Sequence, residues 1–173
     1  MSHARRDPVN QPAAEAAADA AGERVAKWLA APLADFVRET RVRLALVLAP
    51  SGRVFAQHGF TRSLDVMAAC SLAAAIHASA SALGRELGQS LGPLHHGGAD
   101  RQLYLVPVAA GDGALLLLAV FDEDTSLGIV RHFATAFAQR VARAAPPGTG
   151  SAPLAEDFEH ELGRNLATLF GRA

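Results

Sequence analysis

The stretch RLALVLAPSGRVFAQHGF, residues 43–60, contains two apolar runs on either side of Pro50, Ser51 and Gly52. Proline and glycine at the centre of such a segment are typical of a tight turn. The flanking runs have the apolar, partly β-branched composition of strands. The sequence therefore predicts a β-hairpin with strands at about 43–49 and 54–59, largely buried because few of its side chains are polar.

Helical patterns flank this hairpin on both sides. Upstream, apolar residues recur at helical spacing from about Gly22 to Thr40, and Pro32 either kinks this helix or starts a second one. Downstream, an alanine-rich helix is expected at about 63–90, with Asp65 in the first turn, where the helix dipole favours an anion.

Three further strands and a helix complete the domain. Gly97-Gly98-Ala99-Asp100 and Gly111-Asp112-Gly113 are strong turn signals. They separate strands at about 93–97, 101–109 and 114–122, and a helix follows at about 127–144. The strand ALLLLAVFD at 114–122 is apolar on both faces, so both must be covered. The sequence predicts an α+β sandwich: a five-stranded antiparallel sheet with helices on both faces, in the order α-β-β-α-β-β-β-α.

Composition excludes several classes of protein. The chain has 173 residues, half of them apolar, which is enough for one core with tails. Its net charge of −1 provides no basic footprint for nucleic acid and no polybasic membrane anchor. We see no apolar signal core and no apolar stretch of about 18 residues. A cytoplasmic protein without nucleic-acid or membrane contact is expected.

Motifs that carry chemistry are missing. The sequence lacks GxxxxGK[ST], HExxH, CxxC and GxSxG, so we expect no catalytic, cofactor-binding or metal site and no enzyme activity. The single cysteine, Cys70, lies mid-helix among alanines, where a small buried thiol is inert. His95 and His96 could bind metal with His58 and His77, but adjacent strand residues point to opposite faces and cannot easily close on one ion. Structural or surface histidines are favoured.

The helix at 63–90 has two unlike sides. One is the expected core stripe, and it consists of Val66, Ala69, Ala73, Ile76, Ala80, Leu83, Leu87 and Leu91. The other is small and uncharged until its end, which suits a partner or dimer interface, although an alanine-rich genome could produce the same pattern. This candidate interface consists of Leu64, Met67, Ser71, Ala74, Ala75, Ala78, Ala82, Arg85 and Gln89.

The two ends of the chain fall outside the domain, which we place at 22–144. Residues 1–21 are expected to form a flexible arm or the frayed start of a helix, and 145–153 have linker composition. Residues 154–173 are expected to form a C-terminal amphipathic helix, which either packs on its own domain or reaches a partner. Its apolar stripe consists of Leu154, Phe158, Leu162, Leu166 and Phe170.

The stretches LADFVRETRVRLALVLAPSGRVFAQHGF, LYLVPVAAGDGALLLLAVFDED and SLGIVRHFATAFAQRV resemble the roadblock (dynein light chain) family in content, order and spacing. The resemblance covers roughly residues 22–144. It implies a homodimer that binds a small Ras-like GTPase. In the bacterial MglB-like members of the family, the paired middle helices receive the GTPase, and a C-terminal helix touches it elsewhere.

The resulting functional hypothesis is a homodimeric regulator of a small Ras-like GTPase. GTPase activation is favoured, by positioning the partner's own catalytic residues, in a process such as cell polarity or motility. One alternative is a non-catalytic scaffold that binds a GTPase or another protein. A less favoured alternative is a small-molecule sensor, because the expected core offers almost no convergent polar groups.

Overall fold

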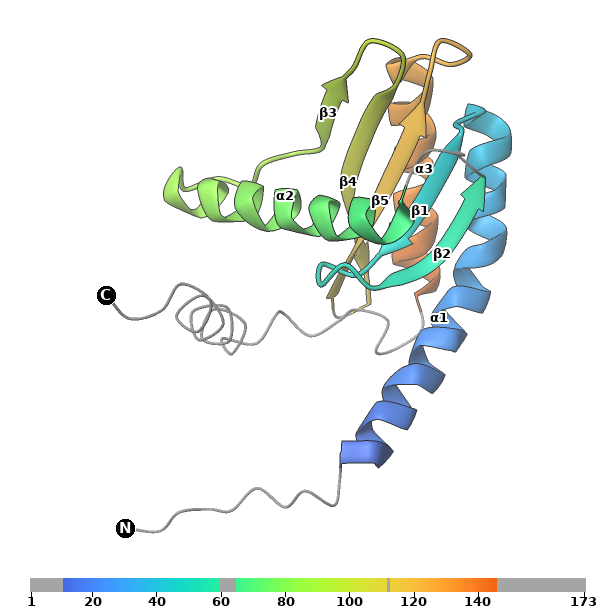
Figure 1. The fold of residues 1–173 in the computed structure, drawn as a ribbon, viewed down its shortest axis with the longest axis vertical. Helices are drawn as coiled ribbons and strands as arrows, with labels where there is room; N and C mark the ends of the chain where they lie inside the picture. Colours follow the sequence, from blue (N-terminus) through green and yellow to red (C-terminus); the bar gives the residue numbers. More distant parts are fainter. Residues whose placement is uncertain (1–10, 60–64, 112, 146–173) are drawn as a thin grey trace.

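The structure, a computed structural model, describes residues 11–59, 65–111 and 113–145. The prediction of an α+β fold around a five-stranded antiparallel sheet is confirmed, with the expected order of elements (Figure 1). These elements are α1 (Gln11–Thr40), β1 (Leu44–Leu48), β2 (Val54–Gly59), α2 (Val66–Glu86), β3 (Leu94–Gly97), β4 (Gln102–Ala110), β5 (Gly113–Phe121) and α3 (Leu127–Ala144).

The sheet has the strand order β2-β1-β5-β4-β3, and all neighbouring strands are antiparallel. The two hairpins, β1–β2 and β4–β5, meet where β1 pairs with β5, with Leu46 opposite Leu118. Gly52 in the first turn has φ +89°, a left-handed conformation that favours glycine. The edges of the sheet are β2 and the four-residue β3.

Both faces of the central strands are buried, as the all-apolar β5 predicted. Alternate residues of β5 point to opposite faces: Leu117, Ala119 and Phe121 join the core beneath α1 and α3, whereas Leu116 and Leu118 join a second core toward α2. The first core is the larger and contains residues from both α1 and α3. In the second core, α2 contributes Cys70 and Ala73 as buried residues and Val66 as a partly buried one. The two faces of the sheet are therefore unequally covered.

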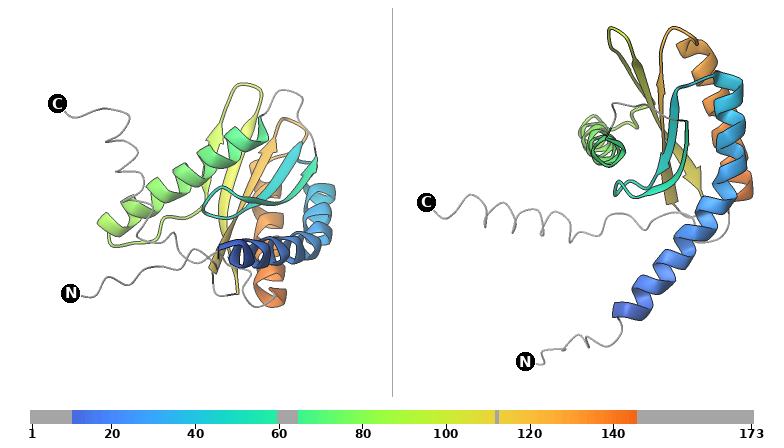
Figure 2. Two further views of the ribbon diagram at one scale, coloured as in Figure 1. Left: turned by 60° about the horizontal axis from the view of Figure 1, so that its bottom comes forward. Right: turned by 45° about the vertical axis from the view of Figure 1, so that its right-hand side comes forward.

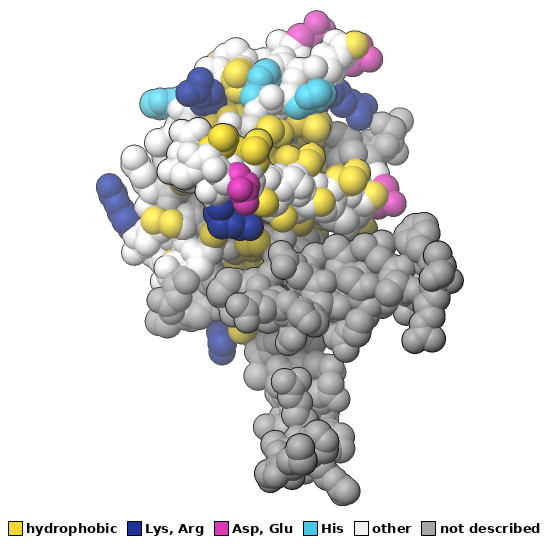
Figure 3. Space-filling model, turned by 90° about the vertical axis from the view of Figure 1, so that its left-hand side faces the viewer, with side chains coloured by type: hydrophobic (Ala, Val, Ile, Leu, Met, Phe, Trp, Pro, Cys, Tyr) yellow, Lys and Arg dark blue, Asp and Glu magenta, His cyan; other side chains and the backbone are white. Residues whose placement is uncertain are grey.

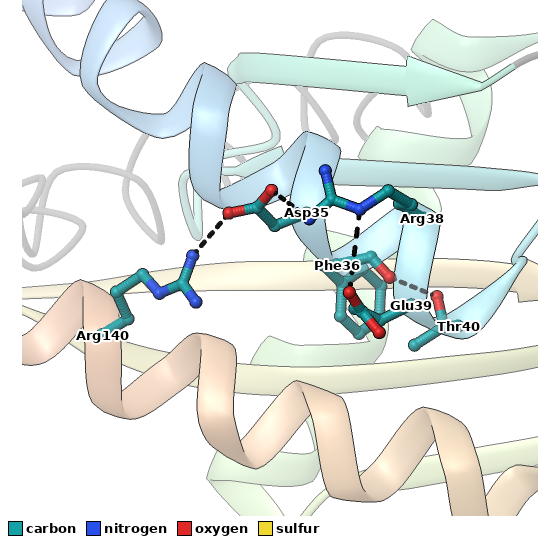
Figure 4. A network of polar contacts seen from close by, with 6 residues as sticks. All are labelled: Asp35, Phe36, Arg38, Glu39, Thr40 and Arg140. Atoms are coloured by element: carbon teal, nitrogen blue, oxygen red, sulfur yellow. Dashed lines mark hydrogen bonds and ion pairs between the residues drawn. The ribbon is translucent and has the colours of Figure 1, made fainter.

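Helices α1 and α3 lie side by side on one face (Figures 1 and 2). Phe36 and Phe137 pack between them with ring centroids 5.9 Å apart. At the surface, Arg140 Nη1 on α3 donates to Asp35 Oδ2 on α1 at 2.8 Å, and Arg38 Nη2 donates to Asp35 Oδ1 at 2.7 Å (Figure 4). We call the ion pairs of Asp35 with Arg38 and Arg140 the Asp35 clamp. Together with the Phe36–Phe137 contact beneath it, the Asp35 clamp holds α1 against α3.

Helix α1 starts earlier than helical periodicity indicates, so the segment before Gly22 is in part the start of a helix rather than an arm. It begins at Gln11, well before the start expected near Gly22, and it continues through Pro32 as one helix. Alanine is the strongest helix former, so the alanine-rich segment extends the helix although it lacks the large apolar residues that helical periodicity detects. Residues 1–10 of the expected arm lie outside the described residues.

Among the described helices, α2 is long and apolar enough to cross a membrane by length and composition. The expectation that the sequence holds no such segment is therefore wrong, because a run of alanines raises hydropathy without large side chains. This is weak evidence for insertion, since a helix of a soluble protein passes the same test. Asp65 caps α2 by accepting from Ala68 N at 3.1 Å, and Cys70 and Ala73 anchor it to the sheet.

Candidate partner interface

Helix α2 crosses the open face of the sheet, and its C-terminal half projects beyond the β4–β3 side (Figures 1 and 2). Large apolar side chains of α2 and its C-cap are therefore left exposed to solvent. The exposed fractions are 42% for Ile76, 54% for Leu83 and 57% for Leu87. All three belong to the stripe that the sequence analysis assigned to the core, and that assignment is wrong for them. The helical spacing identifies an apolar side correctly, but the sheet beneath it is too narrow to bury it.

We call the exposed apolar surface along α2 and the neighbouring strand β3 the α2–β3 face. Hydrophobic side chains gather over its middle, with histidines and a few charged groups around them (Figure 3). Isolated exposed apolar residues are ordinary on protein surfaces, whereas a contiguous group of them marks an interaction site. The exposed large apolar residues of this face are Leu72, Ile76, Leu83, Leu87 and Leu94, whereas Met67, which is also exposed, lies on the outer side of α2 by its helical spacing.

The structure divides the residues proposed from sequence as the interface. Met67, Ser71, Ala75, Ala78 and Arg85 are exposed along α2, and Gln89 is exposed in the turn that follows it. Ala74 is buried instead, because the turn at Gly52 lies against it, and Ala82 is half-buried. Leu64 lies outside the described residues. The residues that sequence reasoning missed are Leu72, Ile76, Leu83, Leu87 and Leu94; their apolar character was visible, but their exposure depends on where the sheet ends.

Two neighbouring hollows lie between α2 and the sheet. One, of about 570 Å³, lies between the C-terminal half of α2 and strands β3 and β4. The other, of about 310 Å³, lies over Leu103, Leu118 and Val120, and Asp65, already occupied as the helix cap, is its one charged lining residue. Ile76, Leu94 and Leu105 line both. The smaller hollow is lined almost wholly by apolar residues, whereas the C-terminal end of the larger one adds the polar residues His77, Ser81, Arg85, Gln89 and Ser90. The shared apolar part of this groove suits apolar side chains of another protein.

Strand β3 forms one edge of the sheet, and all four of its residues are exposed. An edge strand presents unpaired backbone N–H and C=O groups that can pair with another chain. Leu94 and His96 pair with Leu105 and Leu103, which belong to the α2 side of the sheet. The open edge and the apolar groove therefore adjoin each other.

The chain turns sharply between α2 and β3. Gly84 is buried at this turn, and a Cβ there would lie 2.6 Å from the Gln89 carbonyl oxygen. Gly88 follows with φ +65°. His77 lines the larger hollow, and burial lowers the pKa of its imidazole, which favours the neutral form. The turn thus holds the C-terminal half of α2 beside β3, and Arg85 is the charged residue that lines the groove between them.

The candidates for catalysis are not assembled into a site. Cys70 is fully buried, and burial raises the pKa of its thiol, which disfavours the reactive thiolate. Among the described residues, no three or more His, Cys, Asp or Glu residues lie close enough to hold a metal ion. Arg43 forms ion pairs with Asp122, through Nε and Oδ2 at 2.5 Å, and with Asp124. Its hydrogen bond to Asp122 lowers the pKa of the Asp122 carboxyl. This network joins the start of β1 to the end of β5.

The linker at 145–153 and the C-terminal stripe of Leu154, Phe158, Leu162, Leu166 and Phe170 lie outside the described residues, apart from Ala145, which follows α3. Their expected arrangement stays a prediction.

No protein-family model matches the sequence, and neither does any curated protein. Solved structures do match. An MglB with a tetrameric arrangement shares 30% identity and a TM-score of 0.60, over 73% of this chain and 90% of its own. The chain belongs to the MglB family of roadblock proteins. The structure of the gliding protein MglB from Thermus thermophilus is also similar to this chain, with 28% identity and a TM-score of 0.59 over 72% of this chain and 90% of its own.

A Roadblock/LC7 domain from Streptomyces avermitilis shares the fold, with a TM-score of 0.54 at 15% identity over 64% of this chain and 91% of its own. The MglB and roadblock comparisons bear out the family resemblance that the sequence suggested. In this MglB-family chain the solvent-facing side of α2 carries alanine, leucine and isoleucine rather than the lysine and glutamate of an ordinary exposed helix.

Proposed function

We propose that this MglB-family chain is a cytoplasmic, homodimeric regulator of a small Ras-like GTPase. The α2–β3 face carries the proposal, because it is apolar, contiguous and exposed in a single chain. Its large side chains are already about half buried, so covering one of them would contribute roughly half of the about 1.5–3 kcal/mol of a full burial, which still favours an assembly over a free surface. Membership of the MglB family supports a GTPase as the partner.

We assign the homodimer to this face. Pairing of two β3 edges would satisfy their backbone groups, and the adjoining α2 helices would cover each other's apolar residues. A two-fold axis makes such a contact self-complementary, since each copy gives and receives the same surface. The outer side of α2, with Met67, Ala75 and Ala78, would then be available to the GTPase.

The proposed mechanism is positioning. The chain lacks a phosphate-binding loop, so nucleotide is bound by the partner. A dimer that holds the partner's switch segments lets the partner's own residues orient the attacking water and stabilise charge in the transition state. The isolated protein should then show no heat of binding with GTP or GDP in calorimetry.

Single-turnover hydrolysis of GTP bound to a Ras-like GTPase from the same organism tests the proposal. Activation predicts a rate at least tenfold above the intrinsic rate at saturating regulator. Binding with an unchanged rate would replace activation by the scaffold alternative. Release of labelled GDP, measured in parallel, separates nucleotide exchange from hydrolysis, and no binding at all would contradict the proposal.

A further inference from the structure

The edge strand β3 has the sequence Leu-His-His-Gly, so both of its central residues are histidines. Within one chain they cannot share an ion, because His95 pairs with Tyr104 on the α1–α3 side of the sheet and His96 pairs with Leu103 on the α2 side. Neither a third histidine nor a carboxylate completes a metal site among the described residues. Any site formed here needs a second copy of the chain.

The two-fold symmetry of a dimer determines which residues of the two β3 strands lie opposite each other. When two antiparallel edge strands pair about a two-fold axis perpendicular to the sheet, one residue lies opposite its own copy, because cross-strand partners point to the same face. Registers centred on this four-residue strand place either His95 opposite His95 or His96 opposite His96. In both, two identical imidazoles lie across the axis.

The surroundings of the two histidines select His96. The His95 ring leans over its own sheet: its Nε2 is 2.9 Å from Gln102 Oε1, and its ring stacks on Phe121 with centroids 6.3 Å apart. His96 lies exposed on the α2 side, next to the groove. The register that centres His96 also sets His95 opposite Gly97 of the other copy, which leaves room for the tilted ring.

Resting on the homodimer proposed above, we propose that His96 and its copy in the second chain form a site for a divalent transition-metal ion of the zinc class at the dimer axis. Directly opposed residues in an antiparallel pair have Cβ atoms about 4.5–5.5 Å apart, so both imidazoles can converge on one ion at the usual Zn–N distance of about 2.0–2.1 Å. Water completes the coordination. Because only the dimer holds the ion, the metal strengthens dimerisation.

The test compares full-length protein in EDTA with protein in ZnCl₂, using sedimentation equilibrium for the dimer dissociation constant and calorimetry for stoichiometry. We expect one Zn²⁺ per two chains and a dissociation constant lowered about tenfold or more by zinc.

His96→Ala should remove the effect of zinc while the dimer in EDTA persists. His95→Ala, on the same strand, and His58→Ala, on the opposite edge strand, should keep it. The inference is overturned if wild-type dimerisation ignores zinc, if each chain binds an ion by itself, or if His96→Ala responds like wild type. A dimer in EDTA that ignores zinc leaves the proposed homodimer standing, whereas a monomer under every condition rejects both.

Discussion

At the scale of single residues, close backbone contacts and charged clamps decide what the fold tolerates. Gly59 ends β2 with φ +88°, and a Cβ there would lie 2.3 Å from the Arg43 carbonyl oxygen of the neighbouring strand. Gly88 also has positive φ, at +65°, but nothing lies within 4 Å of its Cβ position. Comparing substitutions at Gly59 and Gly88 therefore separates the free-energy cost of a left-handed conformation from the cost of a steric clash.

Gly59→Ala should therefore destabilise the protein more than Gly88→Ala. A left-handed conformation costs a non-glycine residue about 1–2 kcal/mol, and only at Gly59 is a clash with backbone added. Urea unfolding of both variants measures the difference. Equal losses of stability would mean that β1 and β2 can separate to admit a methyl group.

The Asp35 clamp predicts how stability depends on pH. Hydrogen bonds from Arg140 and Arg38 lower the pKa of the Asp35 carboxyl below its ordinary value of about 3.9. The unfolded chain then binds a proton first as pH falls, so the stabilisation is complete above that ordinary value and is lost as pH falls through the folded-state pKa.

Asp35→Asn should thus unfold at lower urea than wild type near neutral pH, and the gap should close as the solution is acidified toward pH 2. Glu123→Gln, a change at an exposed carboxyl remote from this clamp, serves as the control. A gap that stayed constant across the acid range would show that the carboxylate charge contributes nothing.

At the scale of elements, the strands and α3 follow closely from sequence, whereas the role of α2 does not. Periodicity places β2 and α3 at their observed bounds, because turn residues and an apolar stripe mark them locally. Exposure of Leu83 and Leu87 depends instead on a long-range fact, the width of the sheet beneath α2, which no local pattern contains.

Leu83→Ser tests the role of α2 as an interface. The side chain is half exposed in one chain, so the variant should keep most of its stability but weaken the dimer about tenfold, equivalent to about 1.4 kcal/mol. Ile129→Ser on α3, where the isoleucine is 43% exposed on the other side of the sheet, is the matched control. Sedimentation equilibrium of both variants should show an effect only for Leu83.

Ending the chain after Gly150 tests whether the C-terminal stripe is a separable element. The shortened protein should keep its dimer and most of its melting temperature, because α3 and both cores are intact. Affinity for the GTPase, or the rate of nucleotide exchange, should change by about 1–3 kcal/mol of coupling. Leu162→Glu should have the same effect, since a charge on the stripe opposes its burial. A drop of many degrees in melting temperature would instead place the stripe in the core.

At the scale of the whole molecule, the sheet is covered fully on one side and partly on the other. The α1–α3 layer closes the larger core, whereas the α2 side keeps an apolar groove and an open strand edge. The α1–α3 side of the sheet therefore stabilises the fold, whereas the α2 side is the one suited to binding partners. We propose that a Ras-like GTPase binds through α2.

Calorimetric titration of the full-length protein into the Ras-like GTPase of the same genome, loaded with a non-hydrolysable GTP analogue, tests that claim most directly. Wild type should bind, and Ala78→Glu, at an exposed position of α2, should bind at least tenfold more weakly because it buries a charge. Ile129→Glu on α3 should bind as wild type does. Equal affinities of wild type and Ala78→Glu, or no binding by wild type, would contradict the account.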